Sequence, residues 1–227
     1  MTVARLAARP RAVLFDLDGT LIDSAPDLAG ACNEMRIERG LAPLPFADLR
    51  RMVGSGARGM VGVAFGRAPG DAGYEALRDE FLARYESRMT RETRVFEAMV
   101  PVLAWLAEQH IRWGIVTNKA TRFAAPLIAS LGLAQRTSTL VCGDTVAHAK
   151  PHPPPRATAP AECVYVGDDR RDVDAGRAAA MATVVATWGY LGAGDAPDAW
   201  GADHLIAQPD ELPGLIGERP SQESQDV

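Results

Sequence analysis

The segment from residue 12 to residue 23 constrains the fold of this chain more than any other stretch. It begins with four uncharged residues at 12–15, which predict a short strand that is buried on both faces. Asp16 and Asp18 follow, and side chains two positions apart on an extended segment point the same way. Gly19 then lets the chain turn out of the strand, because a residue without a Cβ atom accepts conformations that other residues resist. We therefore expect a buried strand that delivers two carboxylates to one reacting centre.

The next part of the chain has helical spacing, and no strand pattern interrupts it from residue 24 to about residue 93. Ser24 is a candidate N-cap for the first helix. The glycines within residues 53–59 predict a flexible polar turn ahead of an apolar segment. A long amphipathic helix follows, with Phe81 and Tyr85 on its apolar stripe.

Near residue 95 the pattern changes to short apolar strands that alternate with helices. The expected strands lie at residues 111–116, 139–142, 163–166, 182–186 and 204–206. Such alternation implies a parallel sheet that helices cover on both faces. The predicted fold class is therefore α/β, a Rossmann-like parallel-sheet core with an inserted, all-helical unit.

Polar residues follow several of these expected strands. Thr117 and Asn118 follow one strand, and Asp168 and Asp169 follow another. In parallel sheets the functional site lies outside the carboxyl ends of the strands, so these side chains are expected to gather beside Asp16.

The residue types at this edge point to a metal ion and a phosphate group. The acidic residues expected there are Asp16, Asp18, Asp168 and Asp172. Bare carboxylates at close range repel one another, whereas a hard divalent cation such as Mg²⁺ prefers oxygen ligands and works beside phosphate. Thr117 adds a hydroxyl donor and Lys150 a positive charge. This set suits phosphoryl transfer, in which catalysis is mostly positioning and charge stabilisation.

Composition narrows the class of partner. The net charge of −5 argues against a nucleic-acid partner, which would require clustered basic residues. No apolar run approaches the ~20 residues that cross a bilayer, so no membrane partner is expected. The three cysteines lack metal-ligand spacing and fit the reduced, buried thiols of a cytoplasmic protein. We expect a monomer or homodimer that acts on a small molecule.

Four sequence motifs occur in the order that is typical of one enzyme superfamily. They are Asp16-Leu17-Asp18-Gly19-Thr20, Thr117-Asn118, Lys150-Pro151, and Gly167-Asp168-Asp169 with Asp172. With these motifs the chain resembles the phosphatases of the haloacid dehalogenase superfamily over nearly its whole length. The superfamily's dehalogenases are similar but lack an acid at the position of Asp18, so the resemblance implies a phosphatase.

The resemblance also implies a role for each motif residue. Asp16 would be the nucleophile that forms an aspartyl-phosphate, and Asp18 would protonate the leaving oxygen and then activate water. The implied Mg²⁺ ligands are Asp16, the main-chain carbonyl of Asp18, and Asp168, with Asp169 or Asp172 in support. The implied phosphate- and substrate-binding residues are Thr117, Asn118 and Lys150.

Residues 24–93 resemble the helical cap that phosphoglycolate phosphatases of this superfamily insert after the first motif. Such a cap covers the site, excludes water and supplies substrate contacts. Ser55, Gly56 and Arg58 are its candidates for reaching an anionic substrate, because main-chain N–H groups and a guanidinium bind anions. The alternative is that the glycines only make a turn and Arg58 is solvated. The resulting domains are 1–23 and 94–217 for the core, 24–93 for the cap, and 218–227 for a disordered tail.

Two substrates agree with the resemblance. Residues 16–27 and 53–58 resemble phosphoglycolate phosphatases, whereas residues 113–119, 122–124, 188–190 and 200–203 resemble N-acetylmuramic acid 6-phosphate phosphatases. Both substrates are phosphate esters with an additional carboxylate, and the sequence leaves the choice open. A phosphosugar mutase on the same scaffold and a catalytically impaired binding module are the alternatives.

Two departures from the superfamily pattern favour the impaired binding module. The connection at residues 151–162 is shorter than in relatives and rich in proline, so we expect a poorly covered sheet face and a loosely held Lys150. Residues 178–181 have alanine where relatives usually have glycine at a helix end, and alanine in a left-handed cap costs ~1 kcal/mol. We therefore predict reduced stability or activity before any loss of chemistry.

Overall fold

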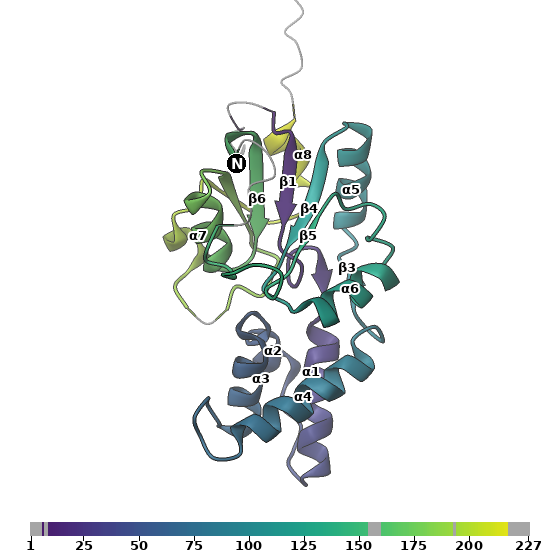
Figure 1. Cartoon of the computed structure of the whole chain (residues 1–227), viewed down its shortest axis with the longest axis vertical. Coiled ribbons are helices and arrows are strands. Elements are labelled where there is room, and N and C mark those ends of the chain that lie inside the picture. Colours follow the sequence, from purple (N-terminus) through teal and green to yellow (C-terminus); the bar gives the residue numbers. More distant parts are fainter. Residues whose placement is uncertain (1–5, 7–8, 154–159, 193, 218–227) are drawn as a thin grey trace, which may run out of the picture.

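The computed structural model describes residues 6, 9–153, 160–192 and 194–217, which form a sheet with flanking helices above a separate group of helices (Figure 1). The described residues form a six-stranded sheet in the order β5-β4-β1-β6-β7-β8, in which all neighbours are parallel. The strands are β1 (Ala12–Phe15), β4 (Arg112–Val116), β5 (Leu140–Val141), β6 (Cys163–Gly167), β7 (Ala182–Ala186) and β8 (His204–Ile206). The expectation of a parallel α/β sheet is confirmed.

Strand β1 lies in the middle of the sheet, where both of its faces are covered. Val13 and Phe15 are fully buried and belong to the main apolar core. Ala12 and Leu14 pack on the opposite face, against a smaller cluster that includes Tyr165. The helices beside the sheet are α5 (Met99–Glu108), α6 (Thr121–Ser130), α7 (Arg170–Ala178) and α8 (Glu211–Ile216). Two sequence expectations, the disordered tail at 218–227 and the centre of the 151–162 connection at 154–159, lie outside the described residues.

A group of helices is inserted between β1 and α5 and lies at the carboxyl end of the sheet (Figure 1). Its members are α1 (Ala25–Glu38), α2 (Phe46–Arg50), α3 (Gly56–Phe65) and α4 (Tyr74–Arg88). Strands β2 (Ile22–Asp23) and β3 (Arg94–Val95) pair antiparallel where the chain leaves the core and returns to it. At this junction the fully buried Asp27 accepts hydrogen bonds from the main-chain N–H groups of Glu92 and Thr93. The inserted all-helical cap is therefore present.

Two local expectations for the cap are wrong. Residues 53–59 are not a flexible turn, because a 3₁₀ helix at Val53–Ser55 leads directly into α3, which begins at Gly56. The Ser24 side chain does not cap α1; its hydroxyl donates to Asp18 Oδ1 at 2.5 Å. The phenol oxygen of Tyr190 accepts the N–H groups of Ser24 and Ala25 instead, at 2.8 and 3.0 Å.

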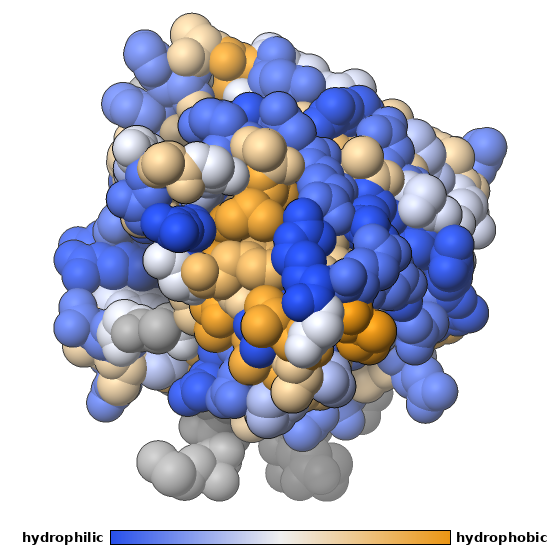
Figure 2. Space-filling model, turned by 90° about the horizontal axis from the view of Figure 1, so that it is seen from below, coloured by the Kyte–Doolittle hydropathy of each residue, from blue (hydrophilic) through white to orange (hydrophobic). Residues whose placement is uncertain are grey.

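The free end of the cap carries an apolar patch. Figure 2, which views the molecule from this end, shows apolar side chains gathered near the middle of the face and surrounded by hydrophilic ones. The large apolar residues exposed in the cap are Ile37, Leu41 and Phe46. Within the described part of the chain, no helix combines the length and apolar character that a membrane span requires.

Candidate active site

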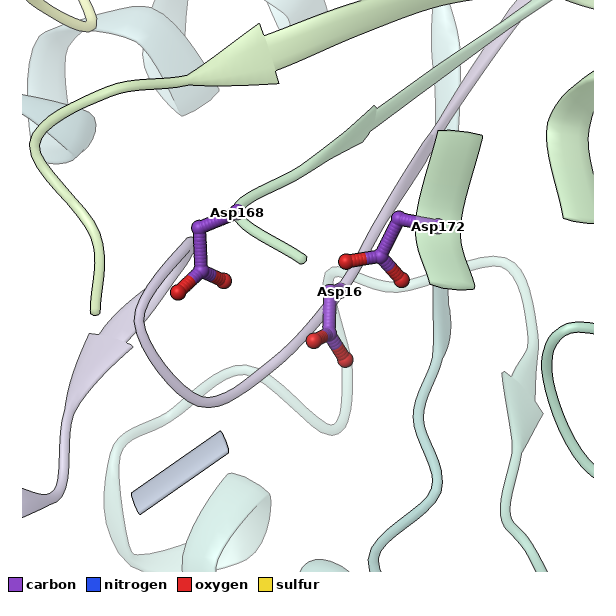
Figure 3. Close-up of side chains that lie close together, drawn as sticks. All are labelled: Asp16, Asp168 and Asp172. Carbon is purple, nitrogen blue, oxygen red and sulfur yellow. The ribbon is translucent and has the colours of Figure 1, made fainter. Parts of the chain in front are cut away.

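Three buried carboxylates meet at the carboxyl edge of the sheet. Asp16 follows β1, Asp168 follows β6, and Asp172 lies in the first turn of α7. The two strands are neighbours, with Phe15 beside Val166, so the residues that follow them are brought together. One oxygen from each carboxylate lies within 4.8 Å of the others, and Figure 3 shows the three side chains converging. The gathering of these acids at one edge was predicted from the topology.

Lys150 lies within this acidic cluster and is held there firmly. Its ammonium group is 2.8 Å from Asp16 Oδ1, 2.6 Å from Asp172 Oδ1 and 3.0 Å from the Val116 carbonyl. The Asn118 amide accepts the Lys150 N–H at 2.8 Å and donates to the Lys150 carbonyl at 3.0 Å. Burial lowers the pKa of Lys150, but the two carboxylates outweigh it and raise that pKa well above its usual value. The expectation of a loosely held Lys150 is therefore wrong.

Asp168 is held by the turn that follows β1. Its Oδ1 accepts the Thr20 hydroxyl at 2.8 Å, and its Oδ2 accepts the Tyr190 N–H at 2.7 Å. Gly19 has a φ of 86°, and a Cβ atom at this position would lie 2.2 Å from Asp168 Oδ2. The turn therefore requires glycine both for its backbone conformation and for this close approach. Burial, and then the charges of Asp16 and Asp172, raise the pKa of Asp168 well above its usual value.

Asp18 is paired with a lysine that the sequence analysis did not assign to the site. The Lys119 ammonium lies 2.9 and 3.0 Å from the two Asp18 carboxylate oxygens. The same ammonium lies 4.8 Å from the ring centroid of Tyr85 on α4 of the cap. Lys119 directly follows Thr117 and Asn118. Its position just after the end of a strand was the sequence signal that could have assigned it to the site.

A cavity of about 430 Å³ lies between the acidic cluster and the cap. Its polar lining from the core includes Asp16, Asp18, Thr117, Asn118, Lys119, Arg122, Lys150 and Arg171. From the cap, Ser55 and Gly56 line it, as expected for substrate-binding candidates. Arg58 is exposed and is missing from the described residues that line the cavity, whereas Arg122, which was not among the predicted site residues, lines it.

Comparison with known proteins places these features in a family. The family model for haloacid dehalogenase-like hydrolases matches residues 13–186. The chain belongs to the haloacid dehalogenase-like hydrolase family. It is 43% identical over 215 residues to an N-acetylmuramic acid 6-phosphate phosphatase of Pseudomonas putida, covering 92% of this chain and 96% of that one. It is 46% identical over 210 residues to a phosphoglycolate phosphatase of Xanthomonas campestris, covering 89% and 95%.

A solved structure shares the fold of this haloacid dehalogenase-like hydrolase. The crystal structure of a "predicted phosphoglycolate phosphatase" from Haemophilus somnus superimposes with a TM-score of 0.79 at 23% identity, over 91% of this chain and 98% of that one. Together with the curated relatives, the family membership identifies the protein as a phosphoric monoester hydrolase.

The donor set of this hydrolase fits the Mg²⁺ that phosphatases of its family generally use. Three carboxylates within 4.8 Å of one another provide hard oxygen ligands. Burial is the main cause that raises the pKa of Asp172, to about 7; the charge of Lys150 lowers this pKa and that of Asp16 raises it. Asp16, Asp168 and Asp172 are thus the side chains that could hold a cation, and each of them also has a hydrogen-bond partner from the protein.

Asp169 and Asp172 have different roles at the start of α7. They form a reciprocal capping box, in which Asp169 accepts the Arg171 N–H and Asp172 accepts the Asp169 N–H. Asp169 also pairs with the Arg171 guanidinium, which lowers the pKa of Asp169 despite its burial. Asp172 therefore contacts both the acidic cluster and the start of α7, whereas Asp169 contacts the start of α7 and the Arg171 guanidinium.

Proposed function

We propose that this phosphatase is a Mg²⁺-dependent hydrolase of a small anionic phosphate ester and acts through an aspartyl-phosphate on Asp16. The observation that carries the proposal is the position of Asp16, beside Asp168 and in contact with Lys150 at the base of a cavity. A carboxylate nucleophile needs a free oxygen that faces its substrate. The Leu17 N–H and Lys150 both contact Asp16 Oδ1, at 2.7 and 2.8 Å, which makes Oδ2 the attacking oxygen.

The proposed reaction has two displacements at phosphorus. Asp16 Oδ2 forms a bond to phosphorus while the bond to the ester oxygen breaks, and Asp18 gives its proton to that leaving oxygen. Asp18 then takes a proton from water, whose oxygen attacks phosphorus. The bond to Asp16 breaks, so inorganic phosphate leaves and the free carboxylate returns.

The remaining site residues bind and orient the phosphate. Thr117 and Lys150 line the cavity and supply a hydroxyl and an ammonium for the phosphate oxygens. Mg²⁺ bound by Asp16, Asp168 and the Asp18 main-chain carbonyl would supply charge neutralisation between the nucleophile and the phosphate. The Asn118 amide acts mainly on the chain, because it fixes the Lys150 backbone in both directions.

The substrate is proposed from the two relatives. One is named for phosphoglycolate and the other for N-acetylmuramic acid 6-phosphate, and both compounds carry a carboxylate besides the phosphate. Arg122 at the cavity provides a cation for that second anionic group. The hypothesis of an impaired binding module loses its main support, because its physical reason was a loose Lys150.

The test is Mg²⁺-dependent release of inorganic phosphate from 4-nitrophenyl phosphate, 2-phosphoglycolate and N-acetylmuramate 6-phosphate, with Asp16→Asn as the control. Turnover that requires both Mg²⁺ and Asp16 supports the proposal. Turnover that survives Asp16→Asn overturns the mechanism. Interconversion of sugar phosphates without net phosphate release would identify a mutase.

A further inference from the structure

The cap side of the active-site cavity is mostly apolar. Its apolar lining from the cap and from α6 consists of Leu28, Val53, Ala57, Phe81, Leu82 and Phe123. These side chains have no chemical role in phosphate transfer, which depends on the polar residues at the sheet edge. They face the space that remains for the organic part of a substrate.

One polar atom within this apolar half makes no well-formed hydrogen bond. Among the described residues, the Tyr85 hydroxyl is the one buried side-chain nitrogen or oxygen of this kind, and the Lys119 ammonium is the charged group beside it. Tyr85 is 2% exposed and lines the cavity. A buried polar group without a partner carries a free-energy penalty, so such a group in a native protein requires an explanation.

The tyrosine ring is fixed, so its hydroxyl has a defined position. The ring centroid lies 6.5 Å from that of Phe81 in a stacked arrangement and 5.5 Å from that of Phe123. The Lys119 ammonium lies 4.8 Å from the centroid. Burial raises the pKa of Tyr85 to about 12, so the phenol stays neutral and can donate a hydrogen bond. The neighbouring positive charge favours an electron-rich acceptor, such as a carboxylate or amide oxygen.

The size of the cavity limits the substrates that can fill it. A volume of about 430 Å³ falls within the range of pockets that enclose drug-sized ligands, roughly 300–1,000 Å³. A two-carbon acid would leave most of the apolar lining in contact with water. A hexose with apolar substituents and a carboxylate would cover that lining and also reach a buried donor.

We propose that Tyr85 is a specificity-determining residue, whose hydroxyl hydrogen-bonds the organic part of the substrate, and that the apolar lining around it selects a bulky amphiphilic leaving group over a two-carbon one. This inference rests on the proposed phosphatase function, because it assigns the leaving-group half of the same cavity. It predicts that N-acetylmuramate 6-phosphate, a hexose phosphate with an acetamido and a lactyl group, is preferred to 2-phosphoglycolate.

The test compares Tyr85→Phe with Tyr74→Phe, the same chemical change on the same helix outside the cavity lining. For Tyr85→Phe we expect kcat/KM for N-acetylmuramate 6-phosphate to fall about five- to tenfold, mostly through KM, because one hydrogen bond is lost. The loss for 4-nitrophenyl phosphate should be smaller. The melting temperature should change little, because the hydroxyl makes no well-formed hydrogen bond in the free enzyme. Tyr74→Phe should leave the kinetics unchanged.

Calorimetric binding of N-acetylmuramate 6-phosphate to the Asp16→Asn protein separates this inference from the proposed function. Weaker binding after Tyr85→Phe in that background supports the subsite even if the chemistry assigned to Asp16 fails. A wild-type preference for 2-phosphoglycolate would overturn the inference while leaving the phosphatase proposal intact. An equal loss for all three esters together with a lower melting temperature would also overturn it, because that result indicates a structural role.

Discussion

The Lys119 ammonium lies 2.9 and 3.0 Å from the two carboxylate oxygens of Asp18, and the side chains of this pair are 9% and 17% exposed. Ser24 donates to Asp18 Oδ1 from the first residue of the cap segment. The proposed acid and base is thus fixed by one contact from the core and one from the cap. The orientation of its carboxylate depends on both contacts.

Replacing Lys119 with Met should impair the proton transfer assigned to Asp18. We expect about a 10- to 100-fold lower kcat/KM for alkyl phosphates, and a smaller loss for nitrophenyl phosphate, because a basic leaving oxygen depends more on general acid catalysis. The measurement is kcat/KM across aryl and alkyl esters of increasing leaving-group pKa. Asp18→Asn should show the same trend, and an equal loss for every ester would contradict this role of Lys119.

Arg50 fixes the cap to the core beside the site. Its guanidinium donates to the carbonyls of Gly189 and Trp188, both at 3.1 Å, and lies 4.9 Å from the ring centroid of Tyr190. Arg50→Lys should lower kcat/KM about three- to tenfold, because a lysine cannot reproduce the two parallel bonds and the stacking. The neighbouring Arg51, whose side chain is 65% exposed and pairs with Asp48, is the matched control. Arg51→Lys should change kcat/KM less than twofold; similar losses in both variants would show that the contact is unimportant.

Arg122 and Arg58 provide a second matched pair, because both are exposed and only Arg122 lines the cavity. Arg122→Gln should raise KM about tenfold for esters with a carboxylate, since one charge-assisted contact is lost. Arg58→Gln should leave KM unchanged. Steady-state kinetics with a phosphate ester that carries a carboxylate and with 4-nitrophenyl phosphate, which carries none, decide the matter. A larger effect of Arg58→Gln would restore the original assignment of Arg58 to the substrate.

The sequence predicts the sheet and its catalytic edge because both depend on simple periodic patterns. Apolar strands that alternate with helices give a parallel sheet, and the positions of Asp16, Thr117 and Asp168 after strand ends place them at one edge. These inferences need no knowledge of individual side-chain contacts, so they are confirmed as far as the gathering of the side chains is concerned.

Contacts between distant parts of the chain were not predictable in this way. Ser24 has the residue type of a helix cap, but the Tyr190 hydroxyl, 166 positions away, accepts the N–H groups of Ser24 and Ala25, and the serine hydroxyl donates to Asp18 instead. The proline-rich connection suggested a loose Lys150, but Asn118, 32 positions earlier, holds its backbone. The conformational propensity of a segment depends only on its own residues. The contacts of Ser24 and Lys150 instead depend on partners far away in the chain, which the sequence pattern does not reveal.

Removal of the metal should affect stability in a pH-dependent way. The pKa of Asp172 is raised to about 7, mainly by burial, and that of Asp168 is raised well above its usual value. A raised carboxyl pKa means that the metal-free fold favours the protonated acid, so this contribution to stability is full below about pH 4 and is lost as the pH rises through about 7. Mg²⁺ binds the ionised form, and its stabilising effect should therefore increase over the same range.

The measurement is the melting temperature with excess Mg²⁺ and with a chelator, at intervals from pH 5 to pH 8. We expect the difference between the two to be larger at pH 8 than at pH 5. Asp168→Asn should remove most of the difference, because it removes a proposed ligand. A difference that is constant with pH would contradict the coupling of the cation to these carboxyl groups.

The end of α7 carries a conformational cost that one substitution should remove. Ala180 has a φ of 58°, in the left-handed region. Its N–H donates to the main-chain carbonyl of Arg177 at 2.9 Å, and the Met181 N–H donates to the main-chain carbonyl of Gly176 at 3.0 Å. These are the two hydrogen bonds of a Schellman motif. This position usually has glycine, because a Cβ atom in the left-handed region costs about 1 kcal/mol or more. The structure thus confirms the strained alanine that the sequence suggested.

Ala180→Gly should therefore stabilise the protein by about 1 kcal/mol, reduced by the conformational entropy that glycine loses on folding. For a chain of this size, the melting temperature should rise by about 2–4 °C at most. The control is Ala178→Gly, an exposed alanine that ends α7 with ordinary helical geometry. Glycine there should destabilise by about 0.5–1 kcal/mol. Urea and thermal unfolding of the two variants give the signs directly. The two variants should change the free energy of unfolding in opposite directions, because Ala180 has a positive φ and Ala178 does not. A loss of stability in both would mean that the hydrogen bonds of the motif, and not the backbone strain, determine the preference at this helix end.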